Sequence, residues 1–306
     1  MTFPHLSIHL RLLGMAALWG ASWPWGRVIA QALPPLTGAS VRFLLATVIL
    51  LPWMLLARRG NPWQGWDAKR WGGMLAAAAA GVMGYSTFFM LGLKEVAAGQ
   101  ASLVVALNPA ATLLLAAWLF REPLNRTIGL GMVLAVLGAL IVLTHGAPWL
   151  LLAGGIGHGQ LLLLGCVSCW VAYTLLGKKV QVGVEALTTT ATTALLGAMM
   201  LTALSLLLEG SSGWQQLPVI SGQVWFALVA LAFGATALAY AWYFHGVKHL
   251  GASVAAGYIA LVPPFGVIFS ALWLGEELGP SLLIGAAVAV CGMLVMHLGR
   301  ARMVSR

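Results

Sequence analysis

Six aromatic or amide side chains lie well inside long apolar segments of this sequence, where polar groups are few. They are Trp19, Tyr85, Asn108, Trp170, Tyr240 and Tyr258. Aromatic faces that carry hydroxyl or amide groups suit a largely apolar small molecule with a few polar handles. The same side chains could instead pack against neighbouring helices or hydrogen-bond to them. They are therefore the candidate lining of a substrate-binding cavity, with helix packing as the alternative.

Charged residues are scarce, and almost all of them avoid the apolar segments. Of 306 residues, 16 are Lys or Arg and 7 are Asp or Glu, which is 8% charged against about 25% in an ordinary soluble domain. This composition excludes a water-soluble fold and intrinsic disorder. Every acid lies at a segment end or in a loop: Asp67, Glu95, Glu122, Glu185, Glu209, Glu276 and Glu277. A proton relay through a carboxylate buried in the membrane is therefore not expected.

Three charged residues deserve separate interpretation. Arg42 is the one charge clearly within an apolar segment, and it could snorkel outward or pair with an acid. Because placing arginine there is costly, it could instead contact a substrate carboxylate. Glu122 and Glu276 end two equivalent segments on opposite faces. They could be surface charges or ion pairs, or they could form one gate at each face of the membrane.

Enzyme motifs are missing from the sequence. It contains no HExxH or GxSxG, and Gly177-Lys178 lacks the remainder of a phosphate-binding loop. Cys166 and Cys169 have CxxC spacing inside an apolar segment, which indicates small helix residues rather than a metal or redox site. We expect no catalytic residue, no metal and no cofactor, and an intramembrane enzyme is disfavoured.

Ten apolar segments position these side chains, and each is long enough to cross a membrane as a helix. They cover residues 9–31, 36–56, 72–93, 97–120, 127–144, 158–177, 186–208, 223–246, 251–274 and 281–298. With both termini in the cytoplasm, most Lys and Arg lie on the inner side, whereas Arg27 and Lys94 lie outside. The net charge of +9 then belongs to the cytoplasmic face and does not indicate nucleic-acid binding.

The two halves of the chain share several residue spacings. Trp19 matches Trp170, and the remaining pairs keep one register: Pro109 with Pro263, Glu122 with Glu276, Gly131 with Gly285, and Gly138 with Gly292. Each half has an odd number of spans, so the second half enters the membrane from the opposite side. Such inverted repeats serve alternating access. We predict a first repeat over 1–145, a linker over 146–156 and a second repeat with a basic cytoplasmic tail over 157–306.

Four prolines lie within the predicted spans, and two of their positions match between the halves. Pro24, Pro109, Pro263 and Pro264 each remove a backbone hydrogen-bond donor. Kinked or unwound helices at matching places in two repeats indicate a binding region. A plain kink without substrate contact is the alternative.

Three stretches resemble the EamA-type ten-helix permeases of the drug/metabolite transporter superfamily. The first is Leu18-Trp19-Gly20-Ala21-Ser22. The second runs from Gly99-Gln100-Ala101-Ser102 through Asn108-Pro109 to Arg121-Glu122, and its echo runs from Gly251-Ala252-Ser253 through Val262-Pro263 to Gly275-Glu276. The resemblance implies two EamA domains, a bacterial inner-membrane location and export of small metabolites such as amino acids.

Together these features predict an all-α polytopic membrane protein of ten transmembrane helices in two inverted-topology five-helix repeats. We expect an exporter of small neutral or zwitterionic metabolites, with amino acids favoured and aromatic ones among them. An uptake permease and a drug or metabolite exporter of proton-exchange type remain alternatives. The expected partners are the substrate and the lipid bilayer, with no ATPase subunit and no nucleic acid. The oligomeric state is left open.

Overall fold

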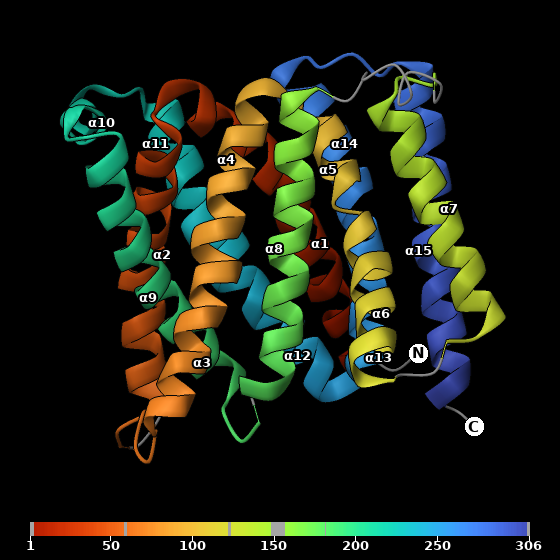
Figure 1. Cartoon of the computed structure of the whole chain (residues 1–306), viewed down its shortest axis with the longest axis horizontal. Helices are drawn as coiled ribbons and strands as arrows, with labels where there is room; N and C mark the ends of the chain where they lie inside the picture. Colours follow the sequence, from red (N-terminus) through yellow and green to blue (C-terminus); the bar gives the residue numbers. More distant parts are fainter. Residues whose placement is uncertain (1–2, 58–59, 122–123, 148–156, 181, 305–306) are drawn as a thin grey trace.

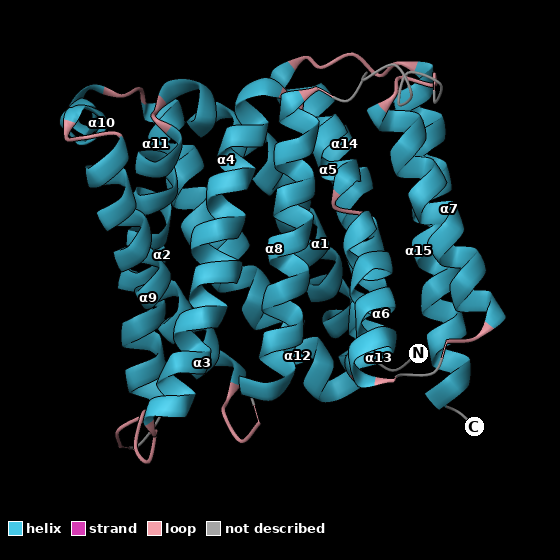
Figure 2. Cartoon of the chain, in the orientation of Figure 1, coloured by secondary structure: helices cyan, strands magenta, loops and turns pink. Residues whose placement is uncertain are grey.

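The computed structural model describes residues 3–57, 60–121, 124–147, 157–180 and 182–304. The described residues form helices and connecting loops, without β-strands (Figure 2). The marked N- and C-terminal ends lie at the same end of the bundle, the lower end in Figure 1. Throughout, "upper end" and "lower end" refer to the view of Figure 1.

The first half contains seven α-helices and one π-helical segment. Their bounds are α1 (Phe3–Ala32), α2 (Pro35–Ala57), α3 (Ala68–Ala78), η1 (Ala79–Gly84), α4 (Tyr85–Glu95), α5 (Ala98–Val104), α6 (Leu107–Phe120) and α7 (Arg126–Leu143). Because α3, η1 and α4 follow one another without a gap, they form one long helical segment. By contrast, α5 and α6 are separated by a short break.

The second half follows a similar order, with a short addition at the upper end. Its bounds are α8 (His158–Val180), α9 (Ala186–Leu208), α10 (Ser212–Gln216), η3 (Leu217–Val219), α11 (Gly222–Val229), η4 (Ala230–Leu238), α12 (Ala239–Leu250), α13 (Ala252–Gly257), η5 (Tyr258–Leu261), α14 (Val262–Leu274) and α15 (Pro280–Val304). Here α11, η4 and α12 form the long continuous segment that corresponds to α3, η1 and α4.

Nine helical segments of the described residues, rather than the ten expected, are long and apolar enough to cross a membrane. They cover 35–57, 68–95, 98–120, 126–143, 158–177, 186–208, 222–250, 254–274 and 280–303. The remaining long helix, α1, has 30 residues but a lower hydropathy. It carries three tryptophans and two arginines along its length, and the indole groups are only weakly apolar on a hydropathy scale. The protein is therefore a multi-pass membrane protein with about nine strongly apolar helices.

Helices of the first half pack mainly against helices of the second. Helix α2 packs on α9, α7 packs on α15, α1 packs on α12 and α14, and α8 packs on α4 and α6. In Figure 1, α7 and α15 form a pair at one side of the bundle, and α2 and α9 form a pair at the other. These reciprocal contacts run from one side of the bundle to the other, so the interface between the halves spans its width.

The contact between α7 and α15 explains the glycine spacing shared by the two halves. A Cβ atom at Gly138 would overlap the backbone of Ala289, and one at Gly292 would overlap the backbone of Ala135. Small residues allow membrane helices to approach closely, so glycine at these positions permits the contact. The shared spacing is thus explained by helix packing rather than by substrate binding.

Candidate substrate-binding site

Two π-helical segments position the aromatic side chains of the candidate site. Segment η1 lies within the third long helical segment and η4 lies at the equivalent place in the second half. Tyr85 is the first residue after η1, and Tyr240 is the second residue after η4. A π-helical turn changes the direction of the side chains that follow it and occurs often at functional sites. No proline or other sequence signal indicated either segment.

Each π-helical segment contacts the first helix of the opposite half. The indole Nε1 of Trp19 on α1 donates a 2.9 Å hydrogen bond to the carbonyl oxygen of Ala235 in η4. On the other side, Gly81 in η1 faces the ring of Tyr173 on α8 so closely that a Cβ atom there would overlap it. The two contacts hold aromatic residues of α1 and α8 toward the centre of the bundle.

A cavity of about 140 Å³ lies between the halves. Its lining is aromatic and carries several hydroxyl groups: Trp19, Trp170, Tyr173, Ala186, Thr190, Tyr240, Tyr243, Phe244 and Ile259. Of the six candidate residues, the structure brings three, Trp19, Trp170 and Tyr240, into this one lining. Because Ala186 and Thr190 belong to the first two turns of α9, the cavity extends from mid-bundle toward the lower end.

Ring contacts connect the cavity lining to a second layer of aromatic residues. The Trp19 ring lies 5.2 Å from the Tyr240 ring and 5.6 Å from the Tyr243 ring, measured between centroids. The Trp170 ring lies 5.7 Å from that of Tyr85, which is therefore one contact behind the cavity wall. These spacings are those of favourable aromatic pairs.

The other two candidate residues lie elsewhere. The Tyr258 hydroxyl is 2.7 Å from Nδ1 of His9, so Tyr258 joins α1 to η5, beside the cavity residue Ile259. Asn108 on α6 is 6% exposed, and its buried Oδ1 atom has no hydrogen-bond partner in the described structure. The structure thus groups four of the six candidates around the cavity and separates Tyr258 and Asn108 from it.

The prolines differ in their local structure. Pro109 lies in the first turn of α6, and Pro263 and Pro264 lie in the first turn of α14. Proline is tolerated there because the first turn has no helical acceptor for its missing N–H. Each of these helices begins after a break, between α5 and α6 and at η5. Pro24 lies inside α1, which continues as one helix, and it borders a separate groove that also contains Trp25 and Trp273.

Arg42 lies inside the bundle without a carboxylate partner among the described residues. Its guanidinium carbon is 4.9 Å from the centre of the Phe43 ring and 5.8 Å from the centre of the Phe89 ring. Its buried Nε atom has no hydrogen-bond partner. Tyr85, Tyr240 and Cys166 are near enough to influence its electrostatics, but none of them is hydrogen-bonded to the guanidinium in the described structure.

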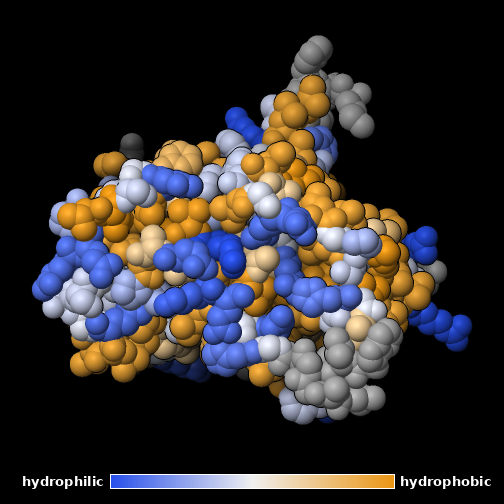
Figure 3. Space-filling view, turned by 90° about the horizontal axis from the view of Figure 1, so that it is seen from above, coloured by the Kyte–Doolittle hydropathy of each residue, from blue (hydrophilic) through white to orange (hydrophobic). Residues whose placement is uncertain are grey.

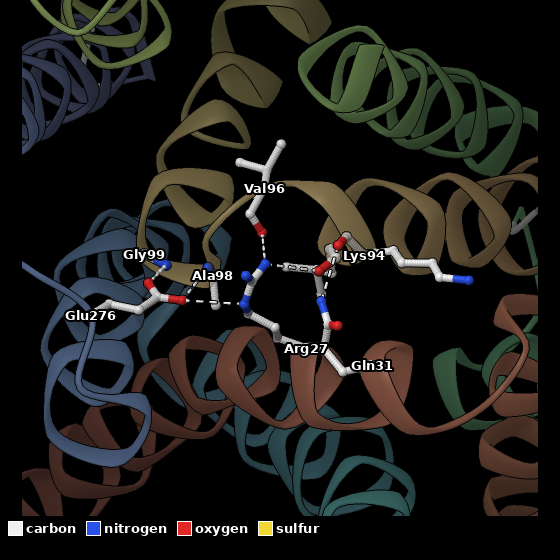
Figure 4. A network of polar contacts seen from close by, with 8 residues as sticks. Arg27, Gln31, Lys94, Val96, Ala98, Gly99 and Glu276 are labelled. Atoms are coloured by element: carbon white, nitrogen blue, oxygen red, sulfur yellow. Dashed lines mark hydrogen bonds and ion pairs between the residues drawn. The ribbon is translucent and has the colours of Figure 1, made fainter. Parts of the chain in front are cut away.

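Arg27 and Glu276 form a polar network at the upper end of the bundle (Figure 4). Arg27 donates hydrogen bonds to the carbonyl oxygens of Leu93, at 3.0 Å, and of Val96. Its Nε atom lies 3.6 Å from Glu276 Oε1. The Glu276 carboxylate also accepts the backbone N–H groups of Ala98 and Gly99 at 2.7 and 2.8 Å, which caps the start of α5.

This network connects the two halves at the upper end of the bundle. Arg27, Ala98 and Gly99 belong to the first half, whereas Glu276 follows α14 of the second. Figure 3 looks onto the same end and shows hydrophilic side chains across its middle, bordered by apolar ones. The proposed counterpart of Glu276, Glu122, lies outside the described residues.

Some lining residues were missed from the sequence. Tyr243, Phe244 and Thr190 line the cavity, and Arg27 is the partner of Glu276. The aromatic run from Tyr240 to Phe244 could have indicated the first two. Thr190 belongs to a threonine-rich stretch at the start of α9, and its sequence does not indicate which side chain faces inward. Arg27 was interpreted only as an outer-side charge.

Comparison with known proteins identifies the family. The EamA-like transporter family matches residues 6–144 and, a second time, residues 157–298. The chain belongs to this family. It is 28% identical over 290 residues to the uncharacterized transporter YyaM of Bacillus subtilis, covering 95% of this chain and 93% of that one. It is 27% identical over 236 residues to a probable terminal-alkyne amino-acid exporter of Streptantibioticus cattleyicolor, covering 73% of each chain.

A solved crystal structure has the same fold. The match has a TM-score of 0.67 and 22% sequence identity, and it covers 98% of this chain and 99% of the other. The EamA protein described here is thus a multi-pass membrane transporter, and the resemblance first inferred from three short stretches is confirmed across nearly the whole chain.

Proposed function

We propose that this EamA protein exports small neutral or zwitterionic metabolites, with aromatic amino acids as the favoured substrates. The observation that carries the proposal is the cavity between the halves, to which the repeat mates Trp19 and Trp170 both contribute. Its aromatic walls favour an apolar side chain, and its hydroxyl groups offer partners for polar atoms. The name of the Streptantibioticus relative, an amino-acid exporter, supports the same substrate class.

The transport mechanism that suits this arrangement is alternating access. We propose that α1 is the tenth span, since 30 residues extend about 45 Å and exceed the hydrocarbon core of about 30 Å. Five spans in each half then give inverted repeats that rock about the cavity. The Arg27–Glu276 network joins the halves at the upper end, and in this mechanism it has to open for substrate to pass.

Charge placement supports an orientation for the exporter. Arg70, Arg121, Arg126 and Arg300 lie near the lower ends of their helices, whereas Arg27 and Lys94 lie near the upper end. The positive-inside rule then places the lower end, with both termini, in the cytoplasm of a bacterial inner membrane. The cavity extends toward this cytoplasmic side, which suits loading of a substrate for export.

The chain carries no carboxylate deep in the bundle among its described residues, and this favours a facilitator driven by the substrate gradient over a proton exchanger. Purified protein in liposomes loaded with a labelled amino-acid mixture tests both points. We expect efflux of aromatic amino acids at the same rate with and without a pH gradient. Efflux that follows the gradient would support proton exchange, and no efflux of any amino acid would overturn the proposed substrate class.

A matched pair of tryptophan variants tests the cavity in the same assay. Trp170→Ala removes a lining ring, whereas Trp118→Ala removes a ring that is 77% exposed on the outside of the bundle. We expect Trp170→Ala to raise the apparent KM about 10-fold, since a buried aromatic contact contributes about 1.5 kcal/mol or more, and Trp118→Ala to leave it unchanged. Equal effects of the two variants would contradict a binding role for the cavity.

A further inference from the structure

Arg42 is the one described side chain that carries a full charge inside the bundle and lacks a carboxylate partner there. A charged side chain at membrane depth is costly, and in membrane proteins such groups almost always pair with an opposite charge or with backbone carbonyls. Among the described residues, the contacts of the Arg42 guanidinium are with the rings of Phe43 and Phe89. None of these groups can neutralise a guanidinium.

The position of Arg42 is not that of a side chain extending to the membrane surface. Its guanidinium lies beside Phe89, which is 1% exposed and packs on the buried Trp23 with ring centroids 5.0 Å apart. An outward-extending arginine would leave the core rather than lie against its most buried rings. The Arg42 residue is partly exposed, but its guanidinium lies against these rings, on a helix that packs on α4 and η4.

The groups around Arg42 connect it to the cavity. Phe89, which lies beside the guanidinium, stacks on Tyr85 with ring centroids 5.9 Å apart. The Tyr85 ring lies at a tilted angle to the ring of the cavity residue Trp170, with centroids 5.7 Å apart. Tyr85 and the cavity residue Tyr240 are the first and second residues after η1 and η4, so they occupy similar places in the two halves.

We propose that Arg42 binds the carboxylate of the transported substrate while the aromatic cavity holds its apolar part. The proposal rests on the proposed function and narrows it, because it requires a carboxylate and predicts exclusion of the corresponding amides and amines. Arginine suits this role, since its planar guanidinium matches a carboxylate with two parallel hydrogen bonds. The buried Nε atom has no hydrogen-bond partner among the described residues, so part of the donor capacity of Arg42 is unused. Substrate binding then supplies the negative charge that the protein itself does not.

Calorimetric titration of the full chain in lipid nanodiscs tests this with four probes: L-phenylalanine, L-phenylalaninamide, 3-phenylpropionate and inorganic phosphate. The wild-type protein should bind the amino acid and the phenyl carboxylate about 10- to 100-fold more tightly than the amide, which is the effect of a charge-assisted hydrogen-bonded pair. Arg42→Gln should remove this preference, and Arg42→Lys should retain part of it. Arg126→Gln, the same change at an exposed arginine, should leave the preference unchanged.

The outcomes separate the two proposals. If 3-phenylpropionate binds in an Arg42-dependent manner while no amino acid is transported, the amino-acid function fails and the carboxylate site stands. If amino acids are transported but the wild-type protein does not prefer acid over amide, or Arg42→Gln keeps that preference, the carboxylate site is overturned. Phosphate binding as tight as that of the carboxylates would also overturn it. Because the readout is a ratio of affinities, it does not depend on how much of each variant folds.

Discussion

Arg27 and Arg42 are two arginines of neighbouring helices with opposite surroundings. Arg27 lies at the upper end of α1, where it donates hydrogen bonds to two backbone carbonyls and forms an ion pair with the carboxylate of Glu276. Arg42 lies on α2 inside the bundle, where the described residues provide aromatic rings and hydroxyl groups but no acid. The first charge is satisfied by the protein. The second is not, although it is the more costly of the two to bury.

The difference shows how this fold separates structural from functional charge. At the upper end, Glu276 caps α5 and Glu209 accepts the N–H groups of Leu36 and Thr37 at the start of α2, so acids of the second half fasten helices of the first. Inside, no described acid competes for Arg42. In the proposed site, a carboxylate that arrives with the substrate pairs with this guanidinium, and its departure leaves the charge uncompensated.

The largest expected effect is on transport, where replacement of Arg42 and replacement of Arg27 should change different kinetic parameters. Arg42→Gln should raise the apparent KM for L-phenylalanine efflux about 10- to 100-fold, because a charge-assisted hydrogen-bonded pair is lost. Arg27→Gln should change the maximal rate instead, since it alters the closure of the upper end rather than the site. Initial efflux rates from proteoliposomes over a range of internal substrate concentrations measure both parameters. Equal rises in KM for the two variants would contradict the assignment of Arg42, and not Arg27, to substrate binding.

Replacement of the two arginines should affect the stability of the protein differently. Arg27→Gln should lower the free energy of unfolding by about 1–2 kcal/mol, because charge-assisted hydrogen bonds to carbonyls are lost and Glu276 loses its counter-charge. Arg42→Gln should leave the ligand-free protein as stable or more stable, because an unpaired charge in the interior is removed. Denaturant unfolding in a single detergent, followed by tryptophan fluorescence, measures the difference. A destabilised Arg42→Gln protein would indicate that Arg42 has a structural partner.

The ion pair between Arg27 and Glu276 should contribute only modestly to the free energy of unfolding. A double-mutant cycle of Arg27→Gln and Glu276→Gln should give a coupling energy of about 0.5–1 kcal/mol, since the charged atoms are 3.6 Å apart and the Arg27 side chain is 27% exposed. The coupling should shrink at high salt because exposed charges are screened. A coupling that is independent of salt would mean that the pair is more deeply buried than the structure shows.

The smallest effect concerns the hydroxyl groups near Arg42. Tyr240→Phe keeps the ring and removes one neutral hydrogen-bonding group, so L-phenylalanine affinity should fall about 2- to 10-fold. Ser168→Ala removes a hydroxyl from an exposed position whose partner is the Leu164 carbonyl of its own helix, and it should change nothing. Titration of both variants in nanodiscs makes the comparison. An unchanged Tyr240→Phe protein would place the bound substrate away from this hydroxyl.

Periodicity and composition predicted the helical membrane class, because a lipid solvent demands long apolar segments of simple composition. They were less successful for α1, which is not among the nine segments of the described residues that are apolar enough to cross a membrane. The glycine and proline spacings predicted which segments correspond between the halves. They did not reveal η1 and η4, since the residues of a π-helical turn do not differ in type from those of an α-helix.

The candidate site could be predicted only in part, because one sequence does not determine how each helix is rotated about its axis. Trp19, Trp170 and Tyr240 share the cavity, whereas Tyr258 bonds to His9 and Asn108 is buried outside the lining. Two alternatives were left open for Arg42, and the choice between them depends on neighbours contributed by distant segments. Phe89 is such a neighbour, and its proximity arises from the packing of α2 on α4.

The most direct test is thermal unfolding of the wild-type protein, Arg27→Gln and Arg42→Gln, each with and without saturating L-phenylalanine. At 100 times the dissociation constant, a ligand stabilises the folded state by about 2.7 kcal/mol, so a rise in Tm reports binding. We predict that the ligand raises the Tm of the wild-type protein and of Arg27→Gln but not that of Arg42→Gln, which without ligand unfolds no earlier than the wild type. An Arg42→Gln protein that unfolds early without ligand, yet gains the full increase in Tm with it, would contradict the assignment of Arg42 to the substrate.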